Sequence, residues 1–212
     1  MADSGGSCTH FCGWVCITTE KDLIQFGVIR TKPKGKTQFT KISFPGGKSI
    51  RDPRPGENWR MEEIHETLER EAIQEVGGKD FHPHYQEEPF LQVSMHKPGL
   101  EPHDKYFFMG LDFRGSLRQG EKTEPDGDIL SPLEFMDAEK AIFEMSQAEG
   151  SSHHLYAAIA AIQKFCELVR EKVSVEKAED LLRHYEYVFA RHESFCRGYE
   201  RKFTVSKPKP KG

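Results

Sequence analysis

The sequence has no long apolar run, no large excess of charge of either sign and few cysteines. Its longest unbroken apolar run, residues 155–162, has eight residues, half of them alanine, whereas a bilayer-spanning helix needs about 20. We therefore expect no membrane-spanning helix. Thirty basic against 34 acidic residues give a net charge of -4, which argues against a nucleic-acid binder held mainly by bulk electrostatics. A small anionic ligand in a local basic pocket is compatible with this balance.

The five cysteines are an odd number in a chain of 212 residues. This count argues against a disulfide scaffold and favours a reducing, cytoplasmic compartment. The first seven residues contain neither a basic nor an apolar segment, so we expect no secretory signal. Cys12 and Cys16 fall on one face of a predicted strand. We interpret them as buried thiols rather than as zinc ligands together with Cys8 and His10.

Aromatic residues are plentiful, because 15 Phe, 6 Tyr and 2 Trp are available to fill the core of one compact domain with a modest extension. Apolar periodicity predicts an amphipathic helix inside a run of strands, followed by further helices. The predicted strands are 11–19, 23–31, 38–44, 89–96, 105–113 and 128–135, and the predicted helices are 60–76, 137–147, 152–172 and 174–199.

The last predicted helix carries an apolar stripe that must be buried somewhere. Its members include Leu181, Leu182, Tyr185, Val188 and Phe189. Two interpretations are open: the stripe docks onto the chain's own domain, or it forms the surface of a homodimer or of another partner. We expect a helical extension over 173–203, followed by a disordered basic tail over 204–212.

The segment that carries chemistry begins with Phe-Pro-Gly-Gly-Lys at 44–48 and continues with Arg-Glu-Ala-Ile-Gln-Glu-Val-Gly at 70–77. On a helix, Glu71 and Glu75 are four residues apart and Gln74 is three from Glu71, so the three side chains share one face. Two carboxylates on one face repel each other. A structure that keeps them together usually has a cation there, and oxygen ligands suit Mg²⁺ or Mn²⁺.

Together with Gly56 and Glu62, this segment resembles the Nudix box, G-x5-E-x7-R-E-U-x-E-E-x-G-U, in which U is a bulky aliphatic residue. The motif covers 56–78, and the order of the flanking strands extends the likeness over 11–170. Three positions depart from the pattern, and the start of the box is ambiguous between Gly56 and the Gly46-Gly47 pair. In the departures Gln74 replaces a glutamate, Ala72 a larger aliphatic residue and Gly78 a hydrophobe.

The resemblance implies an α/β/α sandwich around a mixed sheet over 1–172, with an additional C-terminal helix. It also implies Mg²⁺-dependent hydrolysis of a diphosphate linkage in a nucleoside diphosphate derivative, with Mn²⁺ as an alternative metal. Glu71 and Glu75 would be the metal ligands, the carbonyl of Gly46 or Gly47 a third, and Arg70 an organiser of the loop. Gln74 retains a neutral carbonyl oxygen for the metal, but it brings one negative charge fewer.

Other roles are less specified by the pattern. Because Glu62 lies two turns before Arg70 on the predicted helix, we expect Arg70 to contact the loop or Glu66 and to reach Glu62 only indirectly. The segment that follows the Gly46-Gly47 pair is an apparent insertion relative to the box, and it contains three arginines. Arginine suits phosphate oxygens, so these residues are candidate substrate-binding residues or part of a solvated loop. These are Arg51, Arg54 and Arg60. The candidate general bases, which the sequence does not rank, are Glu121, Glu124, Asp126 and Asp128.

Two alternatives compete with a hydrolase. In the first, a Nudix-fold module has lost hydrolysis and binds a nucleotide or a protein partner, and Gln74 is the feature that favours it. In the second, residues 70–77 are only a solvated helix face that ends in glycine. The second leaves the Phe-Pro-Gly-Gly-Lys segment and the strand order unexplained. A P-loop is excluded, because Ile42 stands where its first glycine is required.

Overall fold

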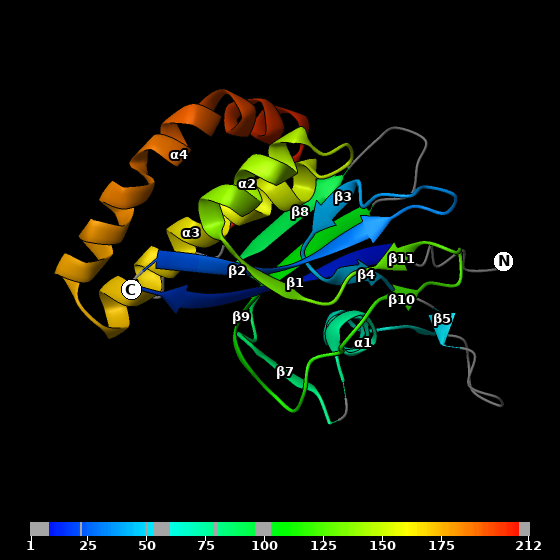
Figure 1. Cartoon of the computed structure of the whole chain (residues 1–212). Coiled ribbons are helices and arrows are strands. Elements are labelled where there is room, and N and C mark those ends of the chain that lie inside the picture. The colour runs from blue at the N-terminus through cyan, green and yellow to red at the C-terminus, as the bar shows by residue number, and fades with distance from the viewer. Residues whose placement is uncertain are drawn as a thin grey trace, which may run out of the picture.

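The computed structural model describes residues 9–21, 23–49, 51–52, 60–78, 80–95 and 103–207. Figure 1 shows a twisted sheet with α1 (Ile64–Val76) on one face. The other face is covered by α2 (Ala138–Gln147), α3 (Ser152–Lys172) and α4 (Val175–Lys202). The expected fold class, an α/β/α sandwich around a mixed sheet with an additional C-terminal helix, is therefore confirmed. No helix in the described ranges is long and apolar enough to cross a membrane.

A long central strand, β1 (Thr9–Glu20), organises the sheet. Its first part runs parallel to β9 (His103–Arg114) and antiparallel to β4 (Gly46–Lys48), and its last part runs antiparallel to β2 (Leu23–Lys32). The strand order is β10-β11-β2-β1-β9-β8-β13, while β12 and β3 also pair with β2, and β7 with β9. The remaining bounds are β3 (Lys41–Ser43), β7 (His82–Tyr85), β8 (Leu91–Met95), β10 (Lys122–Thr123), β11 (Ile129–Leu130), β12 (Glu134–Asp137) and β13 (Thr204–Ser206).

The helix predicted over 60–76 begins later, at Ile64. The backbone N–H of Glu63 donates to Glu66 Oε2 at 2.8 Å in a capping box, which fixes the start of α1 at this point. The preceding β6 (Arg60–Met61) instead pairs with β5 (Arg51–Asp52) in a separate two-stranded sheet. Glu62 therefore lies before the helix and not on it.

The strand predicted over 128–135 is divided into β11 and β12 by Ser131, Pro132 and Leu133. Proline has no N–H to donate to a ladder, so the pairing cannot run through it. Instead Ser131 Oγ accepts a hydrogen bond from the backbone N–H of Arg30 at 2.9 Å. The strand predicted over 38–44 is also shorter than expected, because β3 covers only Lys41–Ser43, and a lysine-rich loop at 33–36 follows β2.

Apolar side chains form one core on each face of the sheet. Between the sheet and α1, Trp14 and Phe108 of the strands pack with Leu68, Ala72 and Val76 of the helix. On the other face, strand residues pack against a long buried side of α3. Cys12 and Cys16 are free, buried thiols as expected, and burial raises the pKa of each to about 12.

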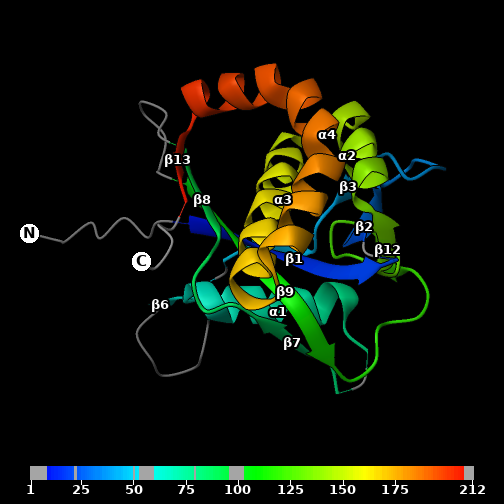
Figure 2. The same ribbon diagram turned by 90° about the vertical axis from the view of Figure 1, so that its left-hand side faces the viewer.

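The last helix docks onto its own chain. Leu181, Tyr185 and Val188 are buried, and Leu182 and Phe189 pack against the same core at its margin. Figure 2 shows α4 lying along α3 and then turning to bring the chain back to the edge of the sheet. Docking onto the chain's own domain is therefore confirmed. A homodimer through the remaining surface of α4, and the division into a domain and an extension at residue 173, stay predictions.

The expectation of a disordered tail is wrong for its first residues. Thr204–Ser206 forms β13, which pairs antiparallel with β8. The exposed edge of β8 supplies hydrogen-bonding groups for an added strand, and Val205 packs against the core. Residues 208–212 lie outside the described part of the chain.

The docking of α4 depends on a buried hydroxyl. The backbone N–H of Ile24 donates to Tyr185 Oη at 2.9 Å, and Tyr185 is fully buried. We expect Tyr185→Phe to destabilise the fold by about 1–3 kcal/mol, because it leaves a buried donor without a partner. Tyr187→Phe is the control, since this side chain is 48% exposed. Urea unfolding should separate the two, and equal stabilities would contradict a role for this bond.

Candidate active site

The glycine pair of β4 lies against α1. The backbone N–H of Gly46 donates to Glu75 Oε2 at 2.6 Å. Gly46 has a φ of 153°, and a Cβ added there would lie 2.2 Å from the carbonyl oxygen of Cys12. A Cβ added to Gly47 would lie 2.1 Å from Glu71 Oε1. Only glycine fits at position 46, and the absence of a side chain at both positions lets the helix carboxylates approach the strand backbone.

Arg70 ties the start of α1 to this strand. Its Nε and Nη2 donate to the two carboxylate oxygens of Glu62 at 2.7 and 2.9 Å. Its Nη1 donates to Glu71 Oε1 at 2.7 Å, and its Nη2 also donates to the carbonyl of Lys48 at 2.8 Å. The role of Arg70 as organiser of the loop stays a prediction. The expectation that Arg70 reaches Glu62 only indirectly is wrong, because Glu62 precedes the helix and turns back beside it.

Glu62 is held in turn by a buried threonine. Thr67 Oγ1 donates to Glu62 Oε2 at 3.0 Å and lies 2.9 Å from His10 Nε2. Since His10 belongs to β1, this chain of contacts connects the central strand to the loop before α1. The two hydrogen bonds to the Glu62 carboxylate are the main reason why the pKa of Arg70 is raised.

The two helix carboxylates sit in an electrostatically unfavourable place. Burial raises the pKa of Glu71, although hydrogen bonding to Arg70 opposes this. Burial also raises the pKa of Glu75 to about 8; the Gly46 N–H lowers it, and the charges of Glu71 and Glu124 raise it further. The neighbouring positive groups thus do not fully neutralise these carboxylates, and a bound cation would relieve the repulsion between them.

The donor set fits a hard divalent cation. Glu71 and Glu75 offer carboxylate oxygens, the adjoining glycine pair offers backbone carbonyls, and Mg²⁺ binds through few carboxylates while keeping several waters. Within the described ranges, no group of three or more His, Cys, Asp or Glu side chains is arranged to hold a metal ion directly.

The structure distinguishes among the four candidate bases. Glu124 is the one whose charge acts on both Glu71 and Glu75, and Lys122 Nζ lies 2.7 Å from its Oε1. The printed contacts of the other three lead elsewhere: two of them bind residues of β2 and the loop that follows it, and one is local. Glu121 pairs with Lys32, Asp126 Oδ1 accepts from the N–H of Asp128, and Asp128 Oδ1 accepts from the N–H of Lys34.

Sequence reasoning missed Arg118. Its Nη2 donates to the carbonyls of Glu75 at 2.7 Å and Ser131 at 2.8 Å, and its backbone N–H donates to the carbonyl of Val76. The last turn of a helix leaves its carbonyls unpaired, and cations are favoured there. Arg118 therefore fixes the end of α1. A lone arginine in a loop carries no motif that would have predicted this.

The three departures from the box have local explanations. Ala72 is fully buried between the helix and the sheet. A Cβ on Gly78 would lie 2.7 Å from Ser116 Oγ, and its N–H donates to the Ser116 carbonyl at 2.8 Å. Gln74 is exposed, and its Oε1 accepts from Arg70 Nη1 at 3.3 Å. Gln74 is thus placed beside Arg70, on the side of the helix that carries Glu71.

The three arginines of the insertion are incompletely placed. Arg51 and Arg60 lie in β5 and β6, which pair with each other, but their side chains are outside the described part. Arg54 and Gly56 lie wholly outside it. A role for these arginines in substrate binding stays a prediction, whereas the Gly46-Gly47 pair is the one seen against the helix carboxylates.

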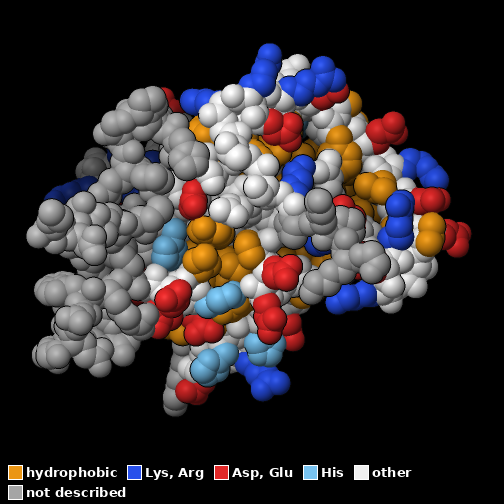
Figure 3. Space-filling view, turned by 180° about the vertical axis from the view of Figure 1, so that it is seen from behind, with side chains coloured by type: hydrophobic (Ala, Val, Ile, Leu, Met, Phe, Trp, Pro, Cys, Tyr) orange, Lys and Arg blue, Asp and Glu red, His pale blue; other side chains and the backbone are white. Residues whose placement is uncertain are grey.

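The opposite side of α1 has a different character. A shallow groove there is lined by His65, Glu69, Pro83, His84, Tyr85 and Glu87. The Tyr85 ring stacks on His65 with centroids 5.7 Å apart, and its hydroxyl donates to Glu69 at 3.0 Å. Figure 3 shows acidic and histidine side chains gathered on the lower part of the molecule's rear side. His82 and His84 are exposed residues of β7.

No family model matches the sequence, and no curated protein sequence matches it. Solved structures that resemble the chain include Nudix proteins. The E. coli ORF135 protein is 18% identical, with 74% of this chain and 94% of that chain covered and a TM-score of 0.45. The Nudix domain of Shewanella oneidensis NrtR complexed with ADP ribose is 11% identical, with 74% of this chain and 87% of that chain covered and a TM-score of 0.47. A C. elegans Ap4A hydrolase is 15% identical, with 74% of this chain and 98% of that chain covered and a TM-score of 0.43. These similarities concern the fold alone.

The position of Phe44, just before the glycine pair, depends on a neutral histidine. The backbone N–H of Phe44 donates to His154 Nδ1 at 3.2 Å, which requires that nitrogen to be unprotonated. The ring of His154 lies among the rings of Phe11, Phe44 and Phe107, with centroids 5.8 to 6.0 Å away. Burial lowers the pKa of His154 to about 3, and Lys105 contributes to the shift.

We therefore expect stability to fall in mild acid. The unfolded chain binds a proton at His154 below a pH of about 6.5, whereas the folded chain resists it until near 3, so stability is complete above about 6.5 and decreases below. The loss should be about 2 kcal/mol at pH 5, because this pH lies about 1.5 units below the pKa of an unfolded histidine. His154→Asn keeps an acceptor but cannot titrate, so its stability should depend less on pH in urea unfolding. The exposed His82→Asn is the control, and identical pH slopes for all three proteins would contradict the assignment.

Gln74 provides a test of the metal face. We expect Gln74→Glu to tighten Mg²⁺ binding by roughly three- to tenfold, because it adds a carboxylate beside Glu71. Calorimetric titration measures this without any turnover. Gln147→Glu adds the same charge at an exposed position of α2, on the other face of the sheet, and should leave the Mg²⁺ affinity unchanged. Equal or weaker binding by the Gln74 variant would show that this side chain does not face the metal.

Proposed function

We propose that the chain is a Mg²⁺-dependent hydrolase of a diphosphate linkage in a nucleoside diphosphate derivative. The observation that carries the proposal is the contact of Glu71 and Glu75 with the backbone of Gly46 and Gly47. It holds two carboxylates beside the strand backbone, whose glycine carbonyls are the proposed further ligands, and the charge of Glu124 acts on both carboxylates from a separate loop. This is the donor chemistry that phosphoryl-transfer enzymes use for magnesium.

The chain's own residues have distinct roles in this proposal. A bound Mg²⁺ ion would neutralise charge on the diphosphate and lower the pKa of a water ligand. Glu124 is the residue proposed to accept the proton of the attacking water, because it faces the helix carboxylates from another segment. Arg70 and Arg118 position the two ends of α1. Neither needs to touch the substrate for this purpose.

The second candidate function is a module that binds a nucleotide or a protein partner without hydrolysing anything. Gln74 is the observation that favours it, because the box has a neutral residue where the pattern has a carboxylate. The two candidates differ in one measurable property. A screen with Mg²⁺ over nucleoside triphosphates, dinucleoside polyphosphates, nucleotide sugars, ADP-ribose and NADH yields products only if the first is right.

The hydrolase proposal depends on Glu75. Glu75→Gln is nearly isosteric and keeps an acceptor for the Gly46 N–H, but it removes a charge from the metal face. We expect hydrolysis to fall by about 10²- to 10³-fold with an unchanged circular dichroism spectrum. Glu69→Gln is the matched control, because Glu69 lies on the same helix but contacts Tyr85 instead. Full activity of the Glu75 variant would exclude catalysis at this helix, and no activity in the parent would favour the binding module.

A further inference from the structure

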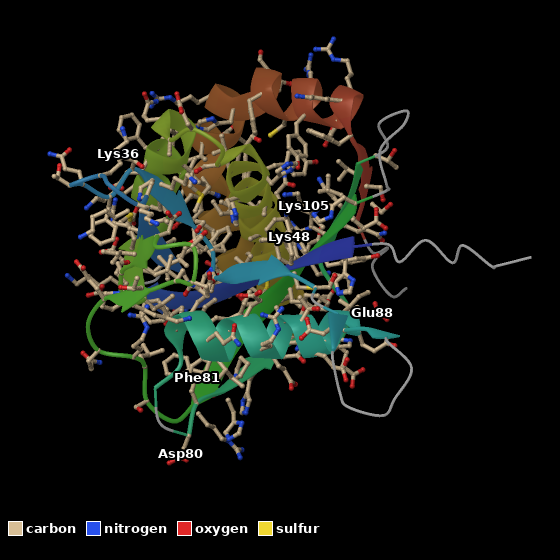
Figure 4. All side chains as sticks on the ribbon, turned by 90° about the vertical axis from the view of Figure 1, so that its right-hand side faces the viewer. Lys36, Lys48, Asp80, Phe81, Glu88 and Lys105 are labelled. Atoms are coloured by element: carbon tan, nitrogen blue, oxygen red, sulfur yellow. The ribbon has the colours of Figure 1, made fainter. Side chains whose placement is uncertain are left out.

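Strand β4 presents two chemically different faces. Gly47 lies against Glu71 on the α1 side. Lys48 is the next residue, so its side chain points to the opposite side of the sheet. Lys48 pairs with Phe11 of β1, and Phe11 pairs with Lys105 of β9. Directly paired residues share a face, so the two lysines flank Phe11 on the α3 side. Figure 4 labels both lysines above α1, on the far side of the strands from it.

The two lysines have no acidic partner among the described residues. Lys105 Nζ lies over the Phe11 ring at 5.0 Å from its centroid, and Lys48 is exposed. The other titratable groups that act on this place are basic as well. His153 and His154 of α3 are affected by Lys105, and His153 also by His103 and Lys202. Burial lowers the pKa of His153 to about 4 and that of His154 to about 3, so both are neutral near pH 7 and the positive charge here comes from the two lysines.

Such an arrangement is costly unless an anion completes it. A partly buried ammonium without a carboxylate loses hydration and gains no ion pair. Burial, and then the charge of Lys48, lowers the pKa of Lys105 to about 8. The nearby ring compensates only in part, because a cation over an aromatic face is worth about 0.5–2 kcal/mol. A bound anion would neutralise the pair and favour the charged form of Lys105.

This basic row adjoins the metal face. Lys48 follows Gly47 in the chain, and its carbonyl accepts from Arg70, which also binds Glu71. An extended anion could therefore contact both places. One part of it would bind a cation held by the helix carboxylates, and the rest would pass the edge of β4 and reach the lysines. Two ammonium groups match the charge of one phosphate group.

We propose that Lys48 and Lys105 bind an additional phosphate group of the substrate, on the α3 side of β4, β1 and β9. The inference rests on the proposed function and narrows its substrate class. A diphosphate linkage alone occupies the metal face, so the lysine pair favours nucleotides with three or more linked phosphates over nucleoside diphosphate sugars.

The first test measures binding without metal or turnover. Tripolyphosphate is titrated into the full-length chain in EDTA at about 0.15 M salt, where long-range attraction is screened. Lys105→Met and Lys48→Met should each weaken binding by roughly tenfold. Lys36→Met removes the same charge from the exposed hairpin loop labelled in Figure 4, so its affinity should match the parent. Absence of tripolyphosphate binding, or equal loss in all three variants, overturns the inference without touching the proposed function.

The second test uses hydrolysis with Mg²⁺. For Lys105→Met, KM for a nucleoside triphosphate should rise roughly tenfold with little change in kcat, while KM for ADP-ribose stays the same. Lys105→Arg should restore part of the affinity. An equal rise for both substrates overturns the additional-phosphate assignment. Lysine-dependent tripolyphosphate binding without hydrolysis of any diphosphate supports the subsite and overturns the proposed function. The melting temperature of Lys105→Met should not fall, because the variant removes an unpaired charge.

Discussion

The close approach of two helix carboxylates to a glycine pair is the constraint on which the rest of the structure depends. Glu75 accepts from the N–H of Gly46, and Glu71 lies where a side chain on Gly47 would be. Carboxylates in such a place are destabilising by themselves, because burial and the charges of neighbouring carboxylates raise the pKa of both. A fold that keeps them there must hold α1 firmly against β4.

Two arginines meet this requirement from opposite ends of the helix. Arg70 joins the loop before α1, the helix itself and the carbonyl of Lys48. Arg118 joins the last turn of α1 to Ser131. Each uses several donors of one planar guanidinium, which a lysine could not reproduce. The apolar contacts of Leu68 and Ala72 with the sheet fix the depth of the helix, and the arginines fix its position along β4.

The sequence was sufficient where one strong local pattern determines the result. Three-four spacing of apolar residues predicts all four helices, and the spacing of Glu71 and Glu75 predicts a shared face. It was insufficient where segments distant in the sequence contact each other, or where the exact start of a helix determines which side chains can meet. Glu62 falls within the periodic pattern, yet the capping box of Glu63 places it before the helix. No local signal ranks Glu124 above its neighbours, since its distance from α1 depends on how β10 pairs with β11 and β11 with β2. Arg118 likewise carries no local signal, because its role depends on contacts with the carbonyls of Glu75 and Ser131 in other segments.

The charge balance of the site gives Gln74 a physical meaning. With all carboxylates ionised, Glu62, Glu71, Glu75 and Glu124 bring four negative charges, while Arg70, Arg118 and Lys122 bring three positive ones. These groups thus sum to a single negative charge, and a divalent cation would reverse the sign. A glutamate at position 74 would instead bring the occupied site to neutrality. A neutral residue there weakens the hold on the cation, but it leaves net positive charge for a polyanionic substrate. The lysine pair on the other side of β4 acts in the same direction.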